Sequence, residues 1–343
     1  MKKAIILFNL GGPDKIENVE PFLFNLFNDP AILNLPTFLR YPLAKLISNR
    51  RAPVAKKIYE ELGGSSPILK LTKEQSNALE VKLNQTQTDE YKCFIVMRCW
   101  NPRAQDVVKD VRLYGPEEIV LMPLYPQYSA ATSGSSIKEW KKVCKKNNYN
   151  IKTSTICCYP TDHNFINAHT KEIIKKIKDL KNFKLIFSAH GLPEKNIKNG
   201  DPYQWQVEQS VKKIIESLND KKLDWILSYQ SRVGPLKWIG PSTEDTIIEN
   251  SKIGKHIVLV PIAFVSEHSE TLVELDIEYK EIAEANGCKN YTRVPALGIN
   301  EDFIKAISEL IIKKDEYKTK DNLYPPKIQC PSNFRKCPCL SYE

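Results

Sequence analysis

The sequence predicts an α/β protein made of two similar halves, each a parallel sheet flanked by helices. The chain of 343 residues is 42% hydrophobic, enough apolar material for one large or two modest domains. Apolar runs of strand length alternate with segments of helical periodicity. The runs are almost continuously apolar, as in parallel strands that are buried on both faces. Two motifs also recur, once in each half.

The expected strands follow one another along the chain as short apolar runs. They are AIILFNL (Ala4–Leu10), KCFIVMR (Lys92–Arg98), EEIVLMPLY (Glu117–Tyr125), FKLIFSAH (Phe183–His190), LDWILSYQ (Leu223–Gln230) and KHIVLVPIAF (Lys255–Phe264). Helical spacing is clearest over 164–180 and 204–218. The first run stops at Gly-Gly-Pro without a small-residue cleavage site, so we expect a strand there and not a signal peptide.

The repeated motifs suggest an internal duplication. ILFNLGGP (Ile6–Pro13) resembles IFSAHGLP (Ile186–Pro193), and 119–136 resembles 257–272. The shared pattern of α/β folds is the other explanation of this likeness. Between its two motifs the first half carries an extra segment, rich in Phe, Leu and Ile, and the stretch 31–59 has basic residues but no acidic ones.

These patterns divide the chain into an N-terminal half over 1–158, a C-terminal half over 159–312 and a C-terminal extension over 313–343. The net charge is +9, but the lysines are spread along the whole chain, so we do not expect nucleic-acid binding. No run has the length of a transmembrane helix, which favours a cytosolic protein. The apolar and basic segment 22–57 suits either an anionic membrane surface or a buried core helix.

Titratable side chains follow two strands of the second half. His190 ends one strand, and Glu267, His268 and Glu270 come after another. In the repeat, Leu10 stands opposite His190. Because ligands of open α/β sheets bind outside the carboxyl ends of the strands, these residues are candidates for a catalytic or metal site. Imidazole near neutral pH accepts a proton or ligates a metal. Ordinary polar residues at strand ends are the alternative.

Three glutamates extend this candidate site. Glu270, Glu274 and Glu278 recur every four residues, so an α-helix would place them along one face. Such a ladder either passes a divalent cation inward or is a solvated face. Aromatic residues such as Tyr203 and Trp238, together with basic residues, suit a flat, conjugated and partly anionic ligand.

The nine cysteines are expected to be reduced thiols or metal ligands, because the chain has no secretory signal. Cys330, Cys337 and Cys339 lie within ten residues, and Cys157 or Cys158 offers a fourth thiolate. The spacing fits zinc or an iron–sulfur cluster and does not choose between them. A tail with idle thiols is the other interpretation.

Longer motifs in the same order resemble those of the ferrochelatase family of class II chelatases. They cover nearly the whole chain: LFNLGGP, RRAP…GGSSPI, LYPQYS…TSGSS, FSAHGLPEK…GDPY, YQSRVGPLKWIGPSTEDT and PIAFVSEHSETLVELDIEY. The resemblance implies two Rossmann-like, chelatase-type halves that face each other across an active-site cleft. It also implies insertion of Fe²⁺ into protoporphyrin IX to give protohaem with release of two protons, the last step of haem biosynthesis.

The resemblance also implies roles for individual residues. Catalysis and iron binding would fall on His190 and Glu270, with His268 as a second catalytic histidine. Glu274 and Glu278 would form a metal path, where family members often have a π-helical turn. The segment 22–57 would form the active-site lip. The porphyrin would contact Leu10, Arg51, Tyr59, Arg98, Tyr203 and Trp238.

Some family members hold a 2Fe–2S cluster, and one bacterial arrangement combines the spacing Cys-x6-Cys-x-Cys with an internal cysteine. By resemblance the ligands would be Cys158, Cys330, Cys337 and Cys339. Two positions depart from the family. Cys99 stands where many relatives have an aromatic residue, and Ala130 stands where some animal enzymes have a cluster cysteine.

Other functions stay open at this point. A coproporphyrin III ferrochelatase or another tetrapyrrole metal chelatase would share most of these motifs. A non-catalytic haem or metal carrier is the alternative of a different class. We expect a cytoplasmic enzyme, peripheral on the inner face of the membrane where the lip binds lipid. The sequence leaves the assembly open, a homodimer included.

Overall fold

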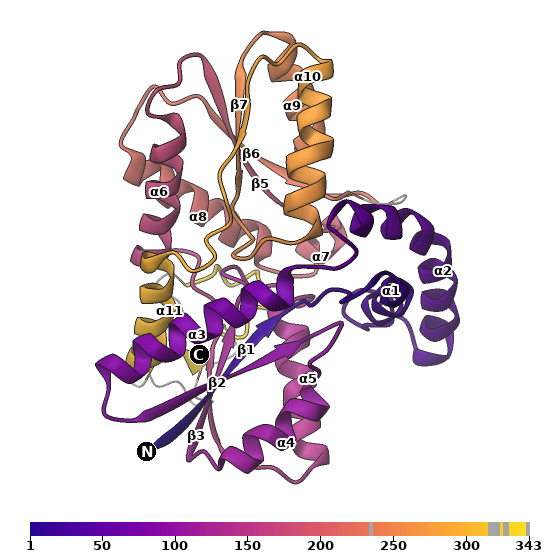
Figure 1. Cartoon of the computed structure of the whole chain (residues 1–343), viewed down its shortest axis with the longest axis vertical. Coiled ribbons are helices and arrows are strands. Elements are labelled where there is room, and N and C mark those ends of the chain that lie inside the picture. Colours follow the sequence, from indigo (N-terminus) through magenta and orange to yellow (C-terminus); the bar gives the residue numbers. More distant parts are fainter. Residues whose placement is uncertain (233–235, 315–322, 325–328, 341–343) are drawn as a thin grey trace. The chain divides into compact units, whose positions relative to one another are not determined.

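The computed structural model describes residues 1–232, 236–314, 323–324 and 329–340 (Figure 1). They form two compact units. Unit 1 comprises Met1–Cys157 with Ile307–Tyr324, and unit 2 comprises Cys158–Ala306 with Pro325–Glu343. The division after Cys157 lies next to the one expected after residue 158. The end of the last long helix, which the sequence analysis gave to the second half, belongs here to unit 1.

The expected C-terminal extension 313–343 lies partly outside the described residues. Within it the structure describes 313–314, 323–324 and 329–340. The three cysteines of the extension fall in the last of these ranges.

Unit 1 is built around a parallel sheet with the strand order β2-β1-β3-β4-β9. The central strand β1 pairs with β2 and β3, and its residues from Ala4 to Phe8 are completely buried. Burial on both faces explains why this stretch is continuously apolar. The strands are β1 (Lys2–Asn9), β2 (Glu90–Met97), β3 (Glu118–Pro123), β4 (Lys152–Ile156) and β9 (Leu323–Tyr324).

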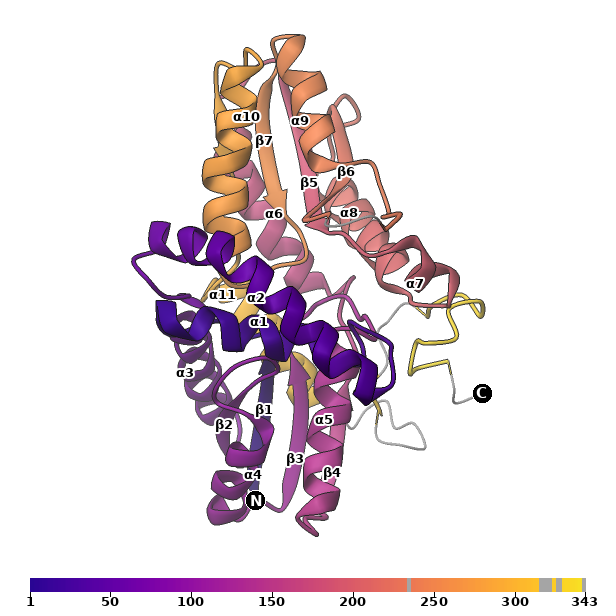
Figure 2. The ribbon, with the colours of Figure 1, turned by 90° about the vertical axis from the view of Figure 1, so that its right-hand side faces the viewer.

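Helices α4 and α5 cover one face of this sheet, where the Trp140 ring meets Phe8 edge-on with 6.4 Å between centroids. Helices α1 and α2 pack against each other and contain most of the predicted lip (Figure 2). The helices of unit 1 are η1 (Ile16–Asn18, a 3-10 helix), α1 (Val19–Phe27), α2 (Thr37–Glu61), α3 (Ile68–Thr86), α4 (Ala104–Tyr114) and α5 (Ser133–Lys146). Helix α11 (Glu301–Lys313) crosses the boundary between the units along the chain.

Unit 2 has a second parallel sheet with the strand order β6-β5-β7-β8. Helices α9 and α10 lie on one side of it, and α6 and α8 lie on the other (Figure 1). The strands are β5 (Phe183–His190), β6 (Trp225–Gln230), β7 (His256–Pro261) and β8 (Tyr291–Arg293). The helices are α6 (His163–Ile177), α7 (Glu194–Lys198), α8 (Tyr203–Leu218), α9 (Thr243–Lys252), η2 (Glu270–Glu278, a π-helix) and α10 (Tyr279–Ala285).

The register of this second sheet decides which residues stand at its carboxyl edge. His190 at the end of β5 pairs with Gln230 at the end of β6, and Ser188 pairs with Pro261 at the end of β7. The backbone N–H of Ile262 donates to the carbonyl of Ser188 at 3.0 Å, which holds the chain after β7 beside β5. The segment that contains Glu270 therefore begins next to His190.

The predicted fold class is confirmed, since both sheets are parallel and flanked by helices. Each of the expected apolar runs forms a strand, whereas the short strands β4, β8 and β9 were not predicted. Within the described parts of the chain, none of the helices combines the length and the apolar character required to cross a membrane.

We expect His169 to make unit 2 less stable as the pH falls. Its ring is completely buried against Phe165, and neither ring nitrogen has a hydrogen-bond partner among the described residues. Burial lowers the pKa of His169 from 6.5 to about 3. Below about pH 6.5 the unfolded chain therefore binds a proton that the folded chain does not, and the free energy of unfolding falls by about 1.4 kcal/mol per pH unit down to about pH 3.

Urea unfolding at pH 7.5 and 5.5 measures this effect. His169→Leu should remove about 1.4 kcal/mol of the pH dependence between these values. His163→Leu, at the exposed start of the same helix, serves as the control. An unchanged pH dependence in His169→Leu would contradict the assignment.

Candidate active site

His190 reaches the carboxyl edge of the unit 2 sheet, where its side chain is 39% exposed. Its Nδ1 lies 2.6 Å from the carbonyl oxygen of Gly191. Because a carbonyl only accepts hydrogen bonds, Nδ1 carries a proton and donates it. In the neutral ring Nε2 then presents a lone pair, and this atom lies 3.7 Å from Oε1 of Glu270.

Gly191 allows the close packing that holds this histidine. A Cβ atom at Gly191 would lie 3.0 Å from the carbonyl oxygen of Gln230 and 3.2 Å from Cε3 of Trp238. A side chain at this position would therefore require the end of β6 or the tryptophan ring to move by a few tenths of an ångström.

A second imidazole faces the same carboxylate. Nδ1 of His268 lies 3.2 Å from the carbonyl oxygen of Ser266, so its Nε2 is directed toward Glu270 and lies 3.8 Å from Oε2. His268 is only 8% exposed and packs against the Phe264 ring at 4.6 Å between centroids. The structure thus brings together the catalytic candidates predicted from the sequence, with Glu270 between His190 and His268.

The charge of Glu270 is set by its neighbours. Burial favours the neutral acid, but the positive charge that His190 and His268 carry when protonated, together with hydrogen bonding from His268 and Ser231, outweighs it and holds the pKa of Glu270 below its usual range. Its Oε2 is buried, and 3.8 Å to His268 is too long for an ordinary hydrogen bond. An ionised carboxylate between two imidazole lone pairs is a donor set for a divalent transition metal.

The glutamate ladder is carried by a π-helix, η2, so the predicted α-helical spacing is wrong here and the π-helical turn implied by the resemblance is confirmed. Its hydrogen bonds run from residue i to i+5, as from the N–H of Tyr279 to the carbonyl of Glu274. Residues five apart therefore become neighbours, and the Tyr279 hydroxyl donates to Oε1 of Glu274 at 2.9 Å.

Glu274 is held firmly by the end of β6. Its carboxylate accepts hydrogen bonds from Nε2 of Gln230 at 3.1 Å and from the backbone N–H and hydroxyl of Ser231 at 2.9 and 2.6 Å. Burial and the charge of Glu270 raise the pKa of Glu274. Burial and Glu274 likewise raise the pKa of the exposed Glu278. The three carboxylates thus lead from the exposed end of η2 to the histidines.

The two predicted porphyrin contacts of unit 2 lie near His190. Tyr203 begins α8 and is 7% exposed, and its hydroxyl lies beside the backbone of His190 and close enough to Glu270 to feel its charge. Burial raises the pKa of Tyr203, so its hydroxyl stays protonated. Trp238 pairs with Pro193 through a short antiparallel bridge, and its buried Nε1 has no partner among the described residues.

The other predicted porphyrin contacts belong to unit 1. Arg98 pairs with Asp29 at 2.9 Å and with Glu139 at 3.2 Å. The exposed Arg51 lies over the Phe27 ring, 5.6 Å from its centroid. The remaining two, Leu10 and Tyr59, pack in an apolar cluster with residues of α1 and α2. The same cluster contains Cys99, which stands where many family members have an aromatic residue.

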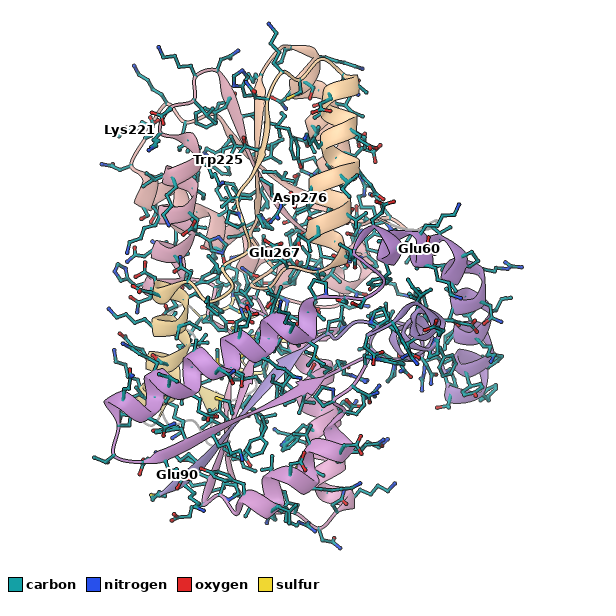
Figure 3. All side chains as sticks on the ribbon, viewed as in Figure 1. Glu60, Glu90, Lys221, Trp225, Glu267 and Asp276 are labelled. Atoms are coloured by element: carbon teal, nitrogen blue, oxygen red, sulfur yellow. The ribbon has the colours of Figure 1, made fainter. Side chains whose placement is uncertain are left out.

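Glu267, a titratable candidate after β7, has a structural role. Its Oε1 accepts hydrogen bonds from Arg293 at 2.8 Å and from the backbone N–H of Ala296 at 2.9 Å. Arg293 also binds Asp276 of η2 through two nitrogens, at 2.6 and 2.7 Å. Glu267 and Asp276, the two acidic partners of Arg293, are labelled in Figure 3. Glu267 therefore fixes the loop that precedes His268, and it does not join the histidine–carboxylate group.

The candidate cysteine ligands are divided between the units. Cys158, Cys330, Cys337 and Cys339 belong to unit 2, whereas Cys157 belongs to unit 1. Within unit 2 the Cys330 thiol hydrogen-bonds with Cys337 and interacts with the buried Cys158. The resemblance also implies Cys158 as the internal ligand. Thiolate donors suit zinc or iron.

Sequence analysis did not identify the residues that support the site. Glu274 is held by Gln230, Ser231 and Tyr279. The first two could have been found from their position at the end of β6, and Tyr279 from its position five residues after Glu274. Gln206, whose Nε2 lies 3.2 Å from the Cys330 sulfur, looks in the sequence like an ordinary helical residue.

Comparison with solved structures shows the fold class. Two structures of SirB, one from Bacillus subtilis with Fe³⁺ and one a sirohydrochlorin chelatase from the subspecies spizizenii in complex with cobalt, are 12 and 13% identical to this chain. Each covers 91% of this chain and 95% of its own length with a TM-score of 0.53. The fold is therefore the α/β fold of the chelatases.

Comparison with protein sequences is more specific. The ferrochelatase family model matches residues 2–315. The ferrochelatase of Pelagibacter ubique is 88% identical over the full length of both chains, and that of Rickettsia bellii is 49% identical over 98% of this chain and 95% of its own. This chain belongs to the ferrochelatase family, whose members are metal–porphyrin lyases.

We expect Gly191→Ala to reduce the rate of metal insertion at least tenfold. The new methyl group must displace the end of β6 or Trp238, and either shift moves the His190 ring by tenths of an ångström. Overpacking should also lower the free energy of unfolding by about 1–3 kcal/mol. Gly240→Ala, whose Cβ would have a single neighbour at 3.8 Å, is the control. Full activity of Gly191→Ala would show that this packing does not position His190.

Proposed function

We propose that this chain inserts Fe²⁺ into protoporphyrin IX, giving protohaem and two protons, with His190, His268 and Glu270 as the reacting groups. The observation that carries the proposal is the carboxylate of Glu270 between two Nε2 atoms, at 3.7 and 3.8 Å. This group offers both a ligand for iron and acceptors for the pyrrole protons. Membership of the ferrochelatase family supports the same reaction.

The electrostatics suggest how the two roles are divided. Glu270 is ionised near neutral pH and one of its oxygens has no hydrogen-bond partner among the described residues, so it is suited to bind the incoming cation. The Nε2 atom of His190 has a free lone pair in the neutral ring and is suited to take a pyrrole proton. The tight contacts of Trp238 and Tyr203 near His190 suit them to grip the macrocycle, which must distort before its nitrogens can accept the metal.

An anaerobic mixture of the purified chain with Fe²⁺ and porphyrin tests the proposed reaction. The absorption spectrum of protoporphyrin IX should change to that of protohaem. A reaction with coproporphyrin III alone would establish the sister activity instead. Binding of protoporphyrin or haem without any metal insertion would establish a carrier.

We expect His190→Ala to lower the rate of iron insertion by about 10²–10⁴-fold, the contribution of a well-placed general base. Porphyrin binding, measured by fluorescence quenching, should stay within about twofold because Trp238 and Tyr203 are unchanged. His163→Ala, an exposed histidine on α6, is the control. Turnover close to that of the wild type would remove His190 from the catalytic group.

We propose that Glu278 and Glu274 form the route by which the metal reaches Glu270. Exposure decreases along the π-helix from Glu278 toward Glu270, and successive carboxylates attract a divalent cation. Four hydrogen bonds hold Glu274. The carboxylate must therefore release at least one of them to pass the cation on.

Glu274→Gln should raise the KM for Fe²⁺ about tenfold and leave the KM for porphyrin within about twofold, because the amide keeps the shape and removes the charge. Glu281→Gln is the control, because it neutralises an exposed glutamate in the first turn of α10. An equal change in both KM values would instead assign Glu274 a purely structural role.

We also propose that the cysteines hold a 2Fe–2S cluster, ligated by Cys330, Cys337, Cys339 and either Cys157 or Cys158. The interactions of Cys330 with Cys337 and Cys158 within unit 2 support a bound group. Such a cluster would supply one-electron redox chemistry or structural stability to unit 2. A red-brown protein with equal amounts of iron and acid-labile sulfide is the expected result, and a colourless protein with one zinc per chain would contradict it.

We propose further that the lip binds anionic membrane surfaces peripherally. Large apolar side chains on α2 and the loop before it are exposed, among them Phe38 at 75%, Val54 at 66% and Tyr41 at 54%. Basic residues such as Lys45 and Arg50 lie exposed between them. Apolar and basic side chains together suit a headgroup region of negative charge.

The double variant Phe38→Ser, Leu39→Ser should weaken cosedimentation with phosphatidylglycerol vesicles at least tenfold, since each buried apolar side chain contributes about 1.5–3 kcal/mol. Leu113→Ser is the control, because Leu113 is 85% exposed on α4, outside the lip. Absence of wild-type binding at low salt would refute the membrane role.

A further inference from the structure

The C-terminal cysteine segment is docked on the beginning of α8. The N–H of Lys336 donates to the carbonyl of Gly200 at 3.0 Å, and the Phe334 ring packs against Trp205 with 6.1 Å between centroids. A Cβ at Gly200 would lie 2.8 Å from the backbone nitrogen of Arg335, so the two backbones are in direct contact. Cys330 is 5% exposed in this arrangement.

Gln206 lies on the same part of α8 and is completely buried. Its side-chain Nε2 is 3.2 Å from the sulfur of Cys330, within hydrogen-bond range for sulfur. An amide NH₂ only donates, so the sulfur is the acceptor, and a thiolate accepts more strongly than a thiol. A hydrogen bond to a ligand sulfur changes the electron density on that sulfur, and so it affects any metal group that the sulfur binds.

We propose that Gln206 is a positioning residue for the iron–sulfur site: its amide donates to the Cys330 ligand sulfur and raises the reduction potential of the cluster. The inference rests on the proposed 2Fe–2S cluster and deepens it. Reduction adds negative charge, part of which resides on the ligand sulfurs. A hydrogen bond to one of them stabilises the reduced form more than the oxidised form.

Gln206→Leu removes the donor at similar volume, and Gln206→Met is a second variant with an unbranched side chain. Gln204→Leu is the matched control, since Gln204 lies on the same helix and its amide donates to Glu208 in an exposed position. Each full-length protein is purified anaerobically. Iron and sulfide contents and the visible spectrum are recorded, followed by a potentiometric titration monitored by electron paramagnetic resonance.

Both Gln206 variants should load iron and sulfide like the wild type. At the wild-type midpoint potential, their ratio of reduced to oxidised cluster should fall about tenfold, which is about 59 mV for a one-electron couple. Gln204→Leu should titrate like the wild type. An unchanged midpoint in a loaded Gln206 variant, or the same shift in Gln204→Leu, overturns the role of Gln206 alone.

Two further outcomes are decisive. Loss of the cluster from both Gln206 variants overturns the tuning role, because the amide would then be required for assembly. A wild-type protein that lacks iron and sulfide, or holds zinc, overturns the proposed cluster itself and with it this inference. The iron and sulfide analysis of the wild type therefore separates the two failures.

Discussion

The site depends on one carboxylate that lies between two imidazoles and has one oxygen to which no described residue donates. Taking an ionised carboxylate out of water costs several kcal/mol unless nearby charges or hydrogen bonds compensate. His190 and His268 supply part of this compensation to Glu270 when their rings are protonated, and the backbone carbonyls of Gly191 and Ser266 determine which ring nitrogens face it. One oxygen of Glu270 still has no hydrogen-bond partner among the described residues. A divalent cation would satisfy that oxygen and the imidazole lone pairs at once, which is the arrangement that the proposed metal-binding role requires.

The π-helix supports the neighbouring carboxylate, Glu274. In an α-helix residues four apart are neighbours, whereas the wider π-helical turn brings Tyr279, five residues on, beside Glu274. Ser231 and Gln230 at the end of β6 then complete the set of donors. A carboxylate held in this way keeps its place next to Glu270 despite the repulsion between the two, which the raised pKa of Glu274 reflects.

Sequence patterns predicted the parts of this arrangement that depend on local chemistry. Continuous apolar runs predicted the long strands, and polar residues at strand ends predicted His190 and Glu270, because burial and strand direction constrain both. The role of Glu267 was missed because its partner Arg293 lies on another strand, far along the chain. The choice between Cys157 and Cys158 stayed open because adjacent residues have almost the same sequence separation from the C-terminal cysteines. The π-helix was expected only from the family, since composition does not set the hydrogen-bond register.

Helix α8 contacts both candidate sites of unit 2, the histidine–carboxylate group and the cysteine segment. Tyr203 and Gln206 are three residues apart on it and so lie on the same face, one beside the His190 backbone and the other beside the Cys330 sulfur. A helix is stiff over one turn, and both ends of this turn are buried. A change that moves the cysteine segment against Gly200 would therefore disturb the same turn of α8 that carries Tyr203. Under the proposed mechanism, in which His190 is the base, the docking of the C-terminal segment would then also affect the active site.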